Sequence, residues 1–391
     1  MRNMLTIVCA LAILAWAGPA WGVLPQHYYF QNASGDSLWM RSGNWLAEDS
    51  TTGIPNDYED DNAWIGSGLT AILDDAPPSG PQDATPKRLR CGISDGTAGT
   101  LHMVGGQLNL MLGWAKYGYI GNNGTGYGDG HVIQEGGEFL AAGFGLGRYG
   151  ATGTWDISGG SVGLIGASGI HMGDGRQQSG STGIMTQTGG TVSVHCNGED
   201  ASNINMVTSD WKGDMHDCTA EYTISGGILH VTGDRVHNGG IAMGPTNDNC
   251  SGNSATFRVI GTWDTPTYYG QVTDNITANM FRMATAGDNN SATLIYDIVD
   301  NGIEKIVVIN NATFAGKLTV TTDAYLTEDH YVLMTYKSRD GTFAETDLPS
   351  GASIAYDQGP CGSELWLVPE PATLALLGLG GLGVLIRRKR R

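Results

Sequence analysis

The chain has 391 residues, among them 60 Gly, 39 Asp or Glu and 21 Lys or Arg, and its formal net charge is -18. Glycine is about twice as frequent as in average proteins but lacks the every-third-residue period of collagen. Hydrophobic residues make up 40% of the chain and charged residues 15%, a composition unlike that of disordered segments. The acidic balance excludes nucleic acid as an expected partner, because affinity for phosphate needs clustered Lys and Arg.

Residues 1–22 have the pattern of a secretory signal peptide. Arg2 precedes an apolar run from Leu5 to Ala17, and small residues follow near position 22. We expect signal peptidase to cleave between Gly22 and Val23 and export to follow. The alternative is an uncleaved anchor, but the run is shorter than the roughly 20 residues that a membrane span needs.

Residues 23–89 are predicted to form an N-terminal cap. The segment ends in a proline-rich stretch, Ala76-Pro77-Pro78-Ser79-Gly80-Pro81, which is typical of a loop or linker. A cap is expected because the first coil of a repeat array otherwise exposes its core and its strand edges.

Residues 90–284 contain a recurring phrase in which alternating apolar residues flank a Gly-Gly pair. The pairs begin at residues 105, 136, 159, 189 and 226. A second marker, an apolar residue followed by glycine and a polar turn, lies between the copies, as in Leu146-Gly147-Arg148. Spacings of this size indicate stacked supersecondary units, and period-2 alternation indicates strands.

These patterns predict an all-β protein, a right-handed parallel β-helix (solenoid) with β caps at both ends. A unit this short cannot bury its own apolar face, so neighbouring units must stack. The rival fold, a β-propeller, needs blades of about 40–45 residues with a steadier period. Residues 285–367 lose the Gly-Gly phrase but keep alternating strands, and we expect there either terminal coils or a small β-sandwich-like cap.

Cysteine and histidine residues give little indication of chemistry. Outside the signal peptide the cysteines are odd in number, and a disulfide among Cys196, Cys218 and Cys250 is the candidate, because their spacings approximate one coil. No spacing matches a zinc or redox motif, so we expect no metal and no cofactor. The turn from His171 to Arg176 brings an acid, a base and a cation together, although Asp-Gly is ordinary turn chemistry.

Two further clusters are candidate binding features. The acidic stretch from Tyr58 to Asn62 offers oxygen ligands for Ca²⁺ but lacks the spacing of a Ca²⁺ loop. An exposed aromatic ladder would indicate an adhesin, and its candidates are Trp114, Tyr117, Tyr119 and Tyr127.

Residues 368–391 form a three-part end. Pro369, Glu370 and Pro371 precede fifteen uncharged residues, 372–386, which predict a short hydrophobic helix. At 1.5 Å per residue this helix is about 22 Å long, less than a hydrocarbon core of about 30 Å. The chain then closes on a basic cluster that would remain cytoplasmic: Arg387, Arg388, Lys389, Arg390 and Arg391.

This end resembles the PEP-CTERM sorting signal of exported bacterial proteins. The resemblance implies that Pro369, Glu370 and Pro371 are recognised by an exosortase-type membrane peptidase, which cleaves near the tripeptide after transient membrane insertion. The repeat region resembles the autotransporter-like passenger repeats of such proteins, a likeness that implies fold and location rather than activity. An ordinary C-terminal anchor, with the tripeptide as a linker, is the alternative.

The function expected from the sequence is therefore that of an exported, noncatalytic protein. Its precursor would be membrane-anchored, and the mature form would lie at the cell envelope or outside the cell, where exopolysaccharide is a candidate partner. No catalytic residue is assigned. Two alternatives remain, a β-helix polysaccharide lyase or hydrolase, which would need convergent carboxylates in a groove, and a carbohydrate-binding adhesin.

Overall fold

The computed structural model describes most of the chain between His27 and Pro369. The excluded internal segments are 56–60, 75–82, 93–96, 112–116, 123–127, 176–178, 197–203, 208–214, 234–238, 246–247, 264–266, 269–270, 273 and 324. The predicted signal peptide, the cleavage point between Gly22 and Val23 and the predicted C-terminal helix all lie outside the described residues.

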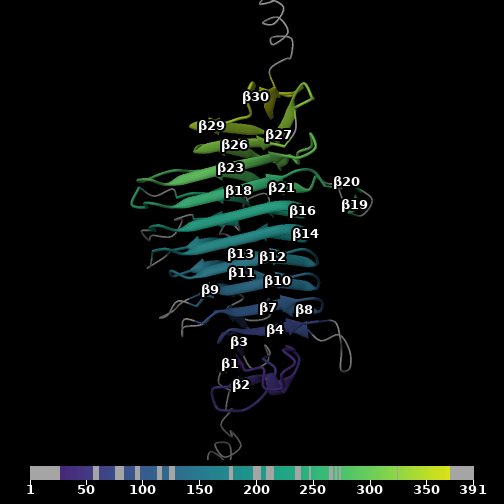
Figure 1. Cartoon of the computed structure of the whole chain (residues 1–391), viewed down its shortest axis with the longest axis vertical. Coiled ribbons are helices and arrows are strands. Elements are labelled where there is room, and N and C mark those ends of the chain that lie inside the picture. Colours follow the sequence, from purple (N-terminus) through teal and green to yellow (C-terminus); the bar gives the residue numbers. More distant parts are fainter. Residues whose placement is uncertain are drawn as a thin grey trace, which may run out of the picture.

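The described chain is all-β, as the alternating pattern predicted. Across the described ranges there are 31 strands, one short 3-10 turn, η1 (Ser42–Asn44), and no α-helix. Twenty-nine strands belong to one continuous hydrogen-bonded sheet, and β19 (Thr267–Tyr268) pairs with β20 (Gln271–Val272) in a separate two-stranded ribbon. Figure 1 shows the strands stacked along the long axis, in chain order from one end of the molecule to the other.

Most strands pair in parallel and form three columns, here named A, B and C. Column A contains β4 (Leu69–Leu73), β7 (Gly99–Met103), β10 (Gly130–Gln134), β12 (Thr152–Ile157), the first halves of β14 (Thr182–Cys196) and β16 (Thr219–Gly233), β18 (Ser254–Ile260), β23 (Ser291–Ile298), β26 (Lys317–Thr322) and β29 (Glu345–Asp347).

Column B contains β5 (Asp83–Ala84), β8 (Gln107–Asn109), the first halves of β11 (Glu138–Arg148) and β13 (Ser161–Asp174), the second halves of β14 and β16, β21 (Ile276–Ala278), β24 (Ile306–Val308) and β27 (Tyr331–Thr335).

Column C contains β1 (His27–Phe30), β3 (Asn62–Ile65), β6 (Arg88–Cys91), β9 (Tyr117–Asn122), the second halves of β11 and β13, β15 (Ile204–Met206), β17 (Gly240–Met243), β22 (Met280–Met283), β25 (Asn311–Phe314) and β28 (Ser338–Gly341). From β3 to β29 the chain visits the columns in the repeating order C, A, B.

The Gly-Gly pairs lie at the corner between columns A and B, where successive turns of the chain come into close contact. A Cβ atom on Gly136 would lie 2.2 Å from the carbonyl oxygen of Val104, closer than any real contact. Gly137 has a φ of +74°, in the left-handed region that side chains resist. The repeat phrase therefore marks the tightest corner of each coil.

The second glycine marker lies at the end of column C, just before the chain enters column A. Gly147 has a φ of +62°, and a Cβ atom there would lie 1.8 Å from the carbonyl oxygen of Thr182 in the next coil. The two sequence markers thus occupy two different corners of the same coil.

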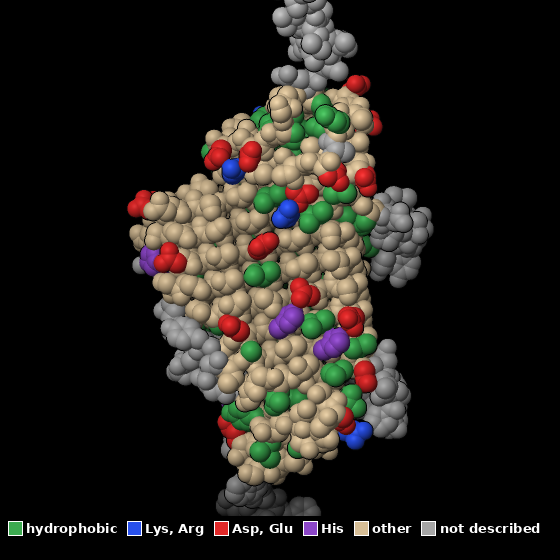
Figure 2. All heavy atoms as spheres, viewed as in Figure 1, with side chains coloured by type: hydrophobic (Ala, Val, Ile, Leu, Met, Phe, Trp, Pro, Cys, Tyr) green, Lys and Arg blue, Asp and Glu red, His purple; other side chains and the backbone are tan. Residues whose placement is uncertain are grey.

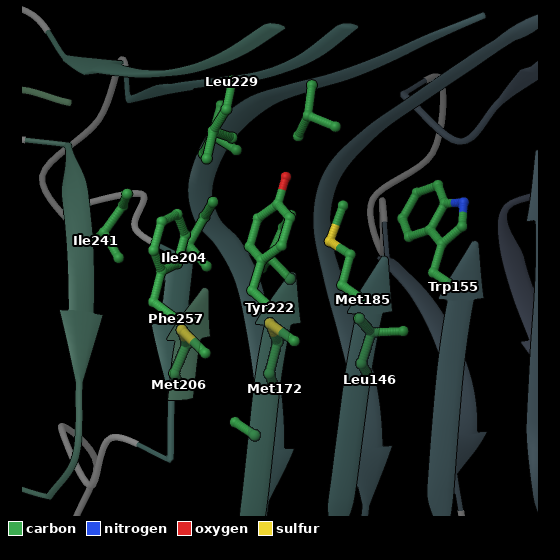
Figure 3. Packing of buried hydrophobic residues seen from close by; sticks show 14 of the residues in the cluster. Leu146, Trp155, Met172, Met185, Ile204, Met206, Tyr222, Leu229, Ile241 and Phe257 are labelled. Carbon is green, nitrogen blue, oxygen red and sulfur yellow. The ribbon is translucent and has the colours of Figure 1, made fainter. Parts of the chain in front are cut away.

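The core lies between the three columns and is built from rows of residues in register. Trp155, Met185, Tyr222 and Phe257 form one such row in column A and are all fully buried. Figure 3 shows them side by side, facing Leu146, Met172 and Met206 of column C. The rings of Tyr222 and Phe257 meet edge to face, with their centroids 5.3 Å apart. This burial of apolar area is the main term that stabilises the stack.

A buried amide accompanies these apolar rows at the corner of columns A and B. The hydroxyl of Tyr222 donates to Oε1 of Gln187 over 2.6 Å, and Nε2 of Gln187 donates to the carbonyl oxygen of Ile228 over 3.0 Å. A buried polar side chain is tolerated because these bonds replace those it would make with water.

Each end of the columns is closed by aromatic residues and antiparallel strands. At the first end, β2 (Trp45–Ala47) pairs antiparallel with β1, and Trp45 donates from Nε1 to the carbonyl oxygen of Trp39 over 2.7 Å. At the other end, β30 (Ala352–Gln358) and β31 (Glu364–Pro369) pair with each other, and β31 pairs antiparallel with β27. The columns thus continue well past residue 284, where the Gly-Gly phrase has stopped.

Candidate sorting site and surface groups

The predicted recognition tripeptide begins where the described fold ends. Pro369 is the last residue of β31, and its register partner on β30 is Ala352. Leu367, two residues earlier, is fully buried and lies opposite Tyr331 of β27 and Ile354 of β30. The chain is therefore paired on both sides at Leu367 and with β30 alone at Pro369. The partner strands β27 and β30 lie at the C-terminal end of the columns (Figure 1).

Side-chain contacts reinforce this last strand. The indole of Trp366 stacks on the imidazole of His330, with ring centroids 3.8 Å apart, and its Nε1 donates to Oε2 of Glu364 over 2.7 Å. The hydroxyl of Tyr336 donates to the carbonyl oxygen of Glu364 over 3.2 Å. These contacts hold β31 against the neighbouring residues at the C-terminal end of the fold.

An ion pair ties the adjoining β30 to column C. The guanidinium of Arg339 on β28 approaches the Asp357 carboxylate at 2.8 Å through Nε and at 2.6 Å through Nη2, a two-pronged contact. Hydrogen bonding from Arg339 lowers the pKa of Asp357 below its usual value because it favours the ionised form. Arg339 also lies over the ring of Tyr356, 4.7 Å from its centroid.

The remaining residues of the sorting signal fall beyond the described strands. Glu370 and Pro371 lie outside the described residues, and so does the basic cluster from Arg387 to Arg391. Within the part of the chain that the structure describes, no helix is long and apolar enough to cross a membrane. The predicted hydrophobic helix at 372–386 remains a prediction.

Of the three cysteines in the predicted disulfide, two have described side chains. Cys218 and Cys250 are buried free thiols, so they do not pair with each other. The reason is register, because Cys218 lies beside Asn253 of the next coil, whose Oδ1 accepts its N–H over 3.0 Å, and not beside Cys250. Cys196 ends β14 in column B, in register with Gly233, and its side chain lies outside the described residues. Burial raises the pKa of Cys218.

The turn that begins at His171 is less solvated than its sequence indicated. Asp174 is buried, and its Oδ2 lies 3.2 Å from Nε of Arg148 on the preceding coil. Arg176 lies outside the described residues. The acid of this turn therefore contacts a cation from a different strand, Arg148 of β11.

The other candidate clusters are only partly described. In the stretch from Tyr58 to Asn62, Asp61 and Asn62 are buried and the preceding residues are outside the described ranges. Among described residues no group of three or more metal-binding side chains comes together. Of the proposed aromatic ladder, Tyr119 alone has a described side chain, and its ring lies 5.2 Å from Cζ of Arg148.

Sequence reasoning missed a set of neighbours on the outward side of column C. Trp64, Arg90 and Tyr119 lie in register on β3, β6 and β9, although 26 to 29 residues separate consecutive members. The signal is present in the sequence as alternation within each strand. It becomes readable only once the register between coils is known.

The surface of column A carries pairs of histidine and acidic side chains, unlike the arginine and aromatic residues of column C. His102 pairs with Glu135 at 3.1 Å and His131 pairs with Asp156 at 2.9 Å, each acid belonging to the following coil. Figure 2 shows a face with scattered acidic side chains, a few basic ones and wide areas of backbone and uncharged polar groups. Such exposed pairs contribute little to stability, about 0–1 kcal/mol each.

The comparisons with known proteins bear on the end of the chain. No curated protein and no solved structure matches the chain. A family model does match, the PEP-CTERM protein-sorting motif, over residues 367–391. This match begins inside β31 and includes Pro369, Glu370, Pro371 and the basic cluster. The chain thus carries a PEP-CTERM signal, the mark of exosortase-dependent sorting of an exported protein.

Proposed function

We propose that this chain is a noncatalytic protein of the cell envelope or extracellular matrix, cleaved by an exosortase at its C-terminal signal. The single observation that carries the proposal is the match of residues 367–391 to the PEP-CTERM sorting motif. The position of that motif supports it, because Pro369, the first residue of the tripeptide, is the last residue of β31, the final strand of the described fold. Cleavage after Pro369 would therefore leave every described strand intact.

The body that is sorted would be a right-handed parallel β-helix. The repeating C, A, B order of parallel strands supports this architecture, and right-handed crossovers predominate strongly between parallel strands of one sheet. The autotransporter-like character of the repeats is part of the same proposal. A stiff, elongated body of this kind suits display at a cell surface.

The noncatalytic role rests on the surface chemistry of the described residues. A glycan-cleaving site on this fold would need carboxylates, or a carboxylate and an arginine, free to meet a substrate. One acid and cation pair of the described residues, Asp174 with Arg148, is buried and already engaged between two coils. A lyase or hydrolase therefore finds no support in this pair.

The proposal is tested by substituting the tripeptide in its own cells. Glu370→Ala should leave a membrane-retained precursor, whereas Glu345→Ala, an exposed acid on β29, should be processed as the wild type is. Fractionation of cells with and without the exosortase gene measures both. Equal processing of wild type and Glu370→Ala, or processing that is unchanged without the exosortase, would overturn the proposal.

A further inference from the structure

Arginine and aromatic side chains gather on the outward side of column C in the first coils of the molecule. Trp64 of β3, Arg90 of β6 and Tyr119 of β9 occupy one register row, so they lie on consecutive rungs about 4.8 Å apart. Arg148, at the end of β11, reaches back over Tyr119. We call these four residues the arginine stripe.

Contacts along the stripe alternate between cation and ring. Cζ of Arg90 lies 5.0 Å from the Trp64 ring centroid, and Cζ of Arg148 lies 5.2 Å from that of Tyr119. Arg148 also lies 4.4 Å from the ring centroid of Tyr149. Tyr149 has a φ of +55°, an uncommon conformation for a bulky residue and one that the surroundings must hold in place.

Within the described residues, Arg90 forms no ion pair with an acid. Its side chain is partly buried, and its Nε atom is shielded from solvent without a hydrogen-bond partner. Arg88 and Arg148 act on its charge unfavourably, whereas Tyr119 and Tyr149 act in the opposite direction. Burial, and then repulsion from Arg88, lower the pKa of Arg90. An arginine held beside two other arginines is unfavourable unless a negative group joins them.

Two described acids near the stripe already have other partners. Asp174 pairs with Arg148 at 3.2 Å. Glu48 accepts a hydrogen bond from the hydroxyl of Tyr29 over 3.4 Å. Arg88, two residues before Arg90 on β6 and therefore on the same side of the strand, is exposed. A further buried donor, Nε1 of Trp64, also lacks a hydrogen-bond partner.

We propose that the arginine stripe, together with Arg88, binds the carboxylate groups of an acidic polysaccharide that runs along the columns. Arginine suits carboxylates because its planar fork donates two parallel hydrogen bonds. The arginines are spread along the long axis of the columns, which fits a linear polymer with spaced charges. The body as a whole is strongly acidic, so binding of any polyanion would depend on these local arginines.

The choice of a polysaccharide rests on the export proposed above, whereas the site rests on the stripe alone. The assay therefore uses purified full-length chain and needs no sorting. Polygalacturonate is the probe, its fully methyl-esterified form is the uncharged control, and binding is followed by biolayer interferometry at low and moderate salt.

Arg88→Gln and Arg90→Gln should each weaken polygalacturonate binding about tenfold or more, the loss expected for one charge-assisted contact. Lys305→Gln removes a positive charge elsewhere, next to Asp274, and should bind as the wild type does. Circular dichroism checks folding. Should Arg90→Gln fail to fold, the exposed Arg88→Gln carries the test.

Three results would overturn the proposal. They are absent binding of polygalacturonate by the wild type, equal binding of the esterified control, and unchanged binding by a folded Arg88→Gln variant. A duplex DNA oligonucleotide and phosphatidylglycerol vesicles serve as competing ligands, and tighter binding of either one through the same arginines would show the ligand class to be wrong. Failed binding with intact exosortase processing would leave the sorting proposal standing.

Discussion

The middle coils and the C-terminal coils share one strand pairing but make their corners differently. Between β7 and β16 the corner of columns A and B is a Gly-Gly pair, and backbone atoms of successive coils come so close there that a Cβ atom would collide with a carbonyl oxygen. From β23 to β29 longer connections replace the pair. Parallel stacking therefore needs rows of buried apolar residues, and the glycine pairs determine how tight each corner is.

The two regions also close their interiors differently. The middle coils use long rows of single residues in register, such as Trp155, Met185, Tyr222 and Phe257. The C-terminal coils continue this row through Leu294 and Leu318 and add a local cluster of rings from several strands, in which the ring centroids of Phe314 and Phe343 lie 4.8 Å apart. A row extends from one coil to the next, whereas the ring cluster lies at the end of the stacked coils.

Removing a ring from a middle row should have the largest effect. Trp155→Ala deletes a fully buried side chain that contacts Phe139 and Phe144 at 5.0 and 4.7 Å between centroids. We expect a loss of about 3–5 kcal/mol in the free energy of unfolding, measured by chemical denaturation. Phe343→Ala in the C-terminal cluster should cost less, since Phe343 keeps some exposure. Equal losses would remove the distinction between row and cluster.

A substitution at the tight corner comes next. A Cβ atom on Gly159 would lie 2.1 Å from the carbonyl oxygen of Glu135, so Gly159→Ala must push two coils apart. Overpacking of this kind costs about 1–3 kcal/mol, read as a lowered denaturation midpoint. Gly43→Ala is the matched control because nothing lies within 4 Å of its new Cβ. If both variants denature at the wild-type midpoint, the corner is not as tight as described.

Buried hydroxyl groups test whether the two regions are equally well hydrogen-bonded. Tyr222 donates to Gln187 in the middle coils and Tyr296 donates to the carbonyl oxygen of Leu333 in the C-terminal coils, each over 2.6 Å. Tyr222→Phe and Tyr296→Phe should each cost about 1–2 kcal/mol, because each leaves a buried acceptor unpaired. Thermal denaturation of the two variants makes the comparison, and a neutral result at either site would show that its acceptor finds another donor.

The smallest effect is expected at the ion pair of the C-terminal cap. The Asp357 pKa is lowered in the folded chain, so its contribution is present above the usual carboxyl pKa and is lost as the pH falls through the lowered value. Arg339→Gln should abolish this pH dependence and cost under about 1 kcal/mol at neutral pH, since the pair is largely exposed. Stability measured from pH 7 down to pH 2 tests both points. If the stability of Arg339→Gln fell with decreasing pH as that of the wild type does, the contribution assigned to Asp357 would be wrong.

Sequence alone predicted the all-β class and the position of the glycine corners, because both depend on patterns within one coil. It could not predict which side chains meet between coils. Cys218 and Cys250 look like neighbours by spacing, but insertions of different length shift their register. Trp64, Arg90 and Tyr119 look unrelated by spacing and lie on adjacent rungs.

The candidate sorting site, unlike the contacts between coils, could be predicted from the sequence. The tripeptide and the basic cluster could be recognised from the sequence because they are a contiguous signal, read by a partner rather than formed by folding. The structure adds where that signal begins, at the last paired residue of β31. That anchoring depends on β27 and β30, whose pairing with β31 no local pattern encodes.

Intact mass spectrometry of the protein recovered from the cell envelope and the medium tests sorting most directly. The account predicts a species that begins at or near Val23 and ends near Pro369-Glu370-Pro371, without Arg391. A mature species that retains Arg391 in cells with a working exosortase would contradict it.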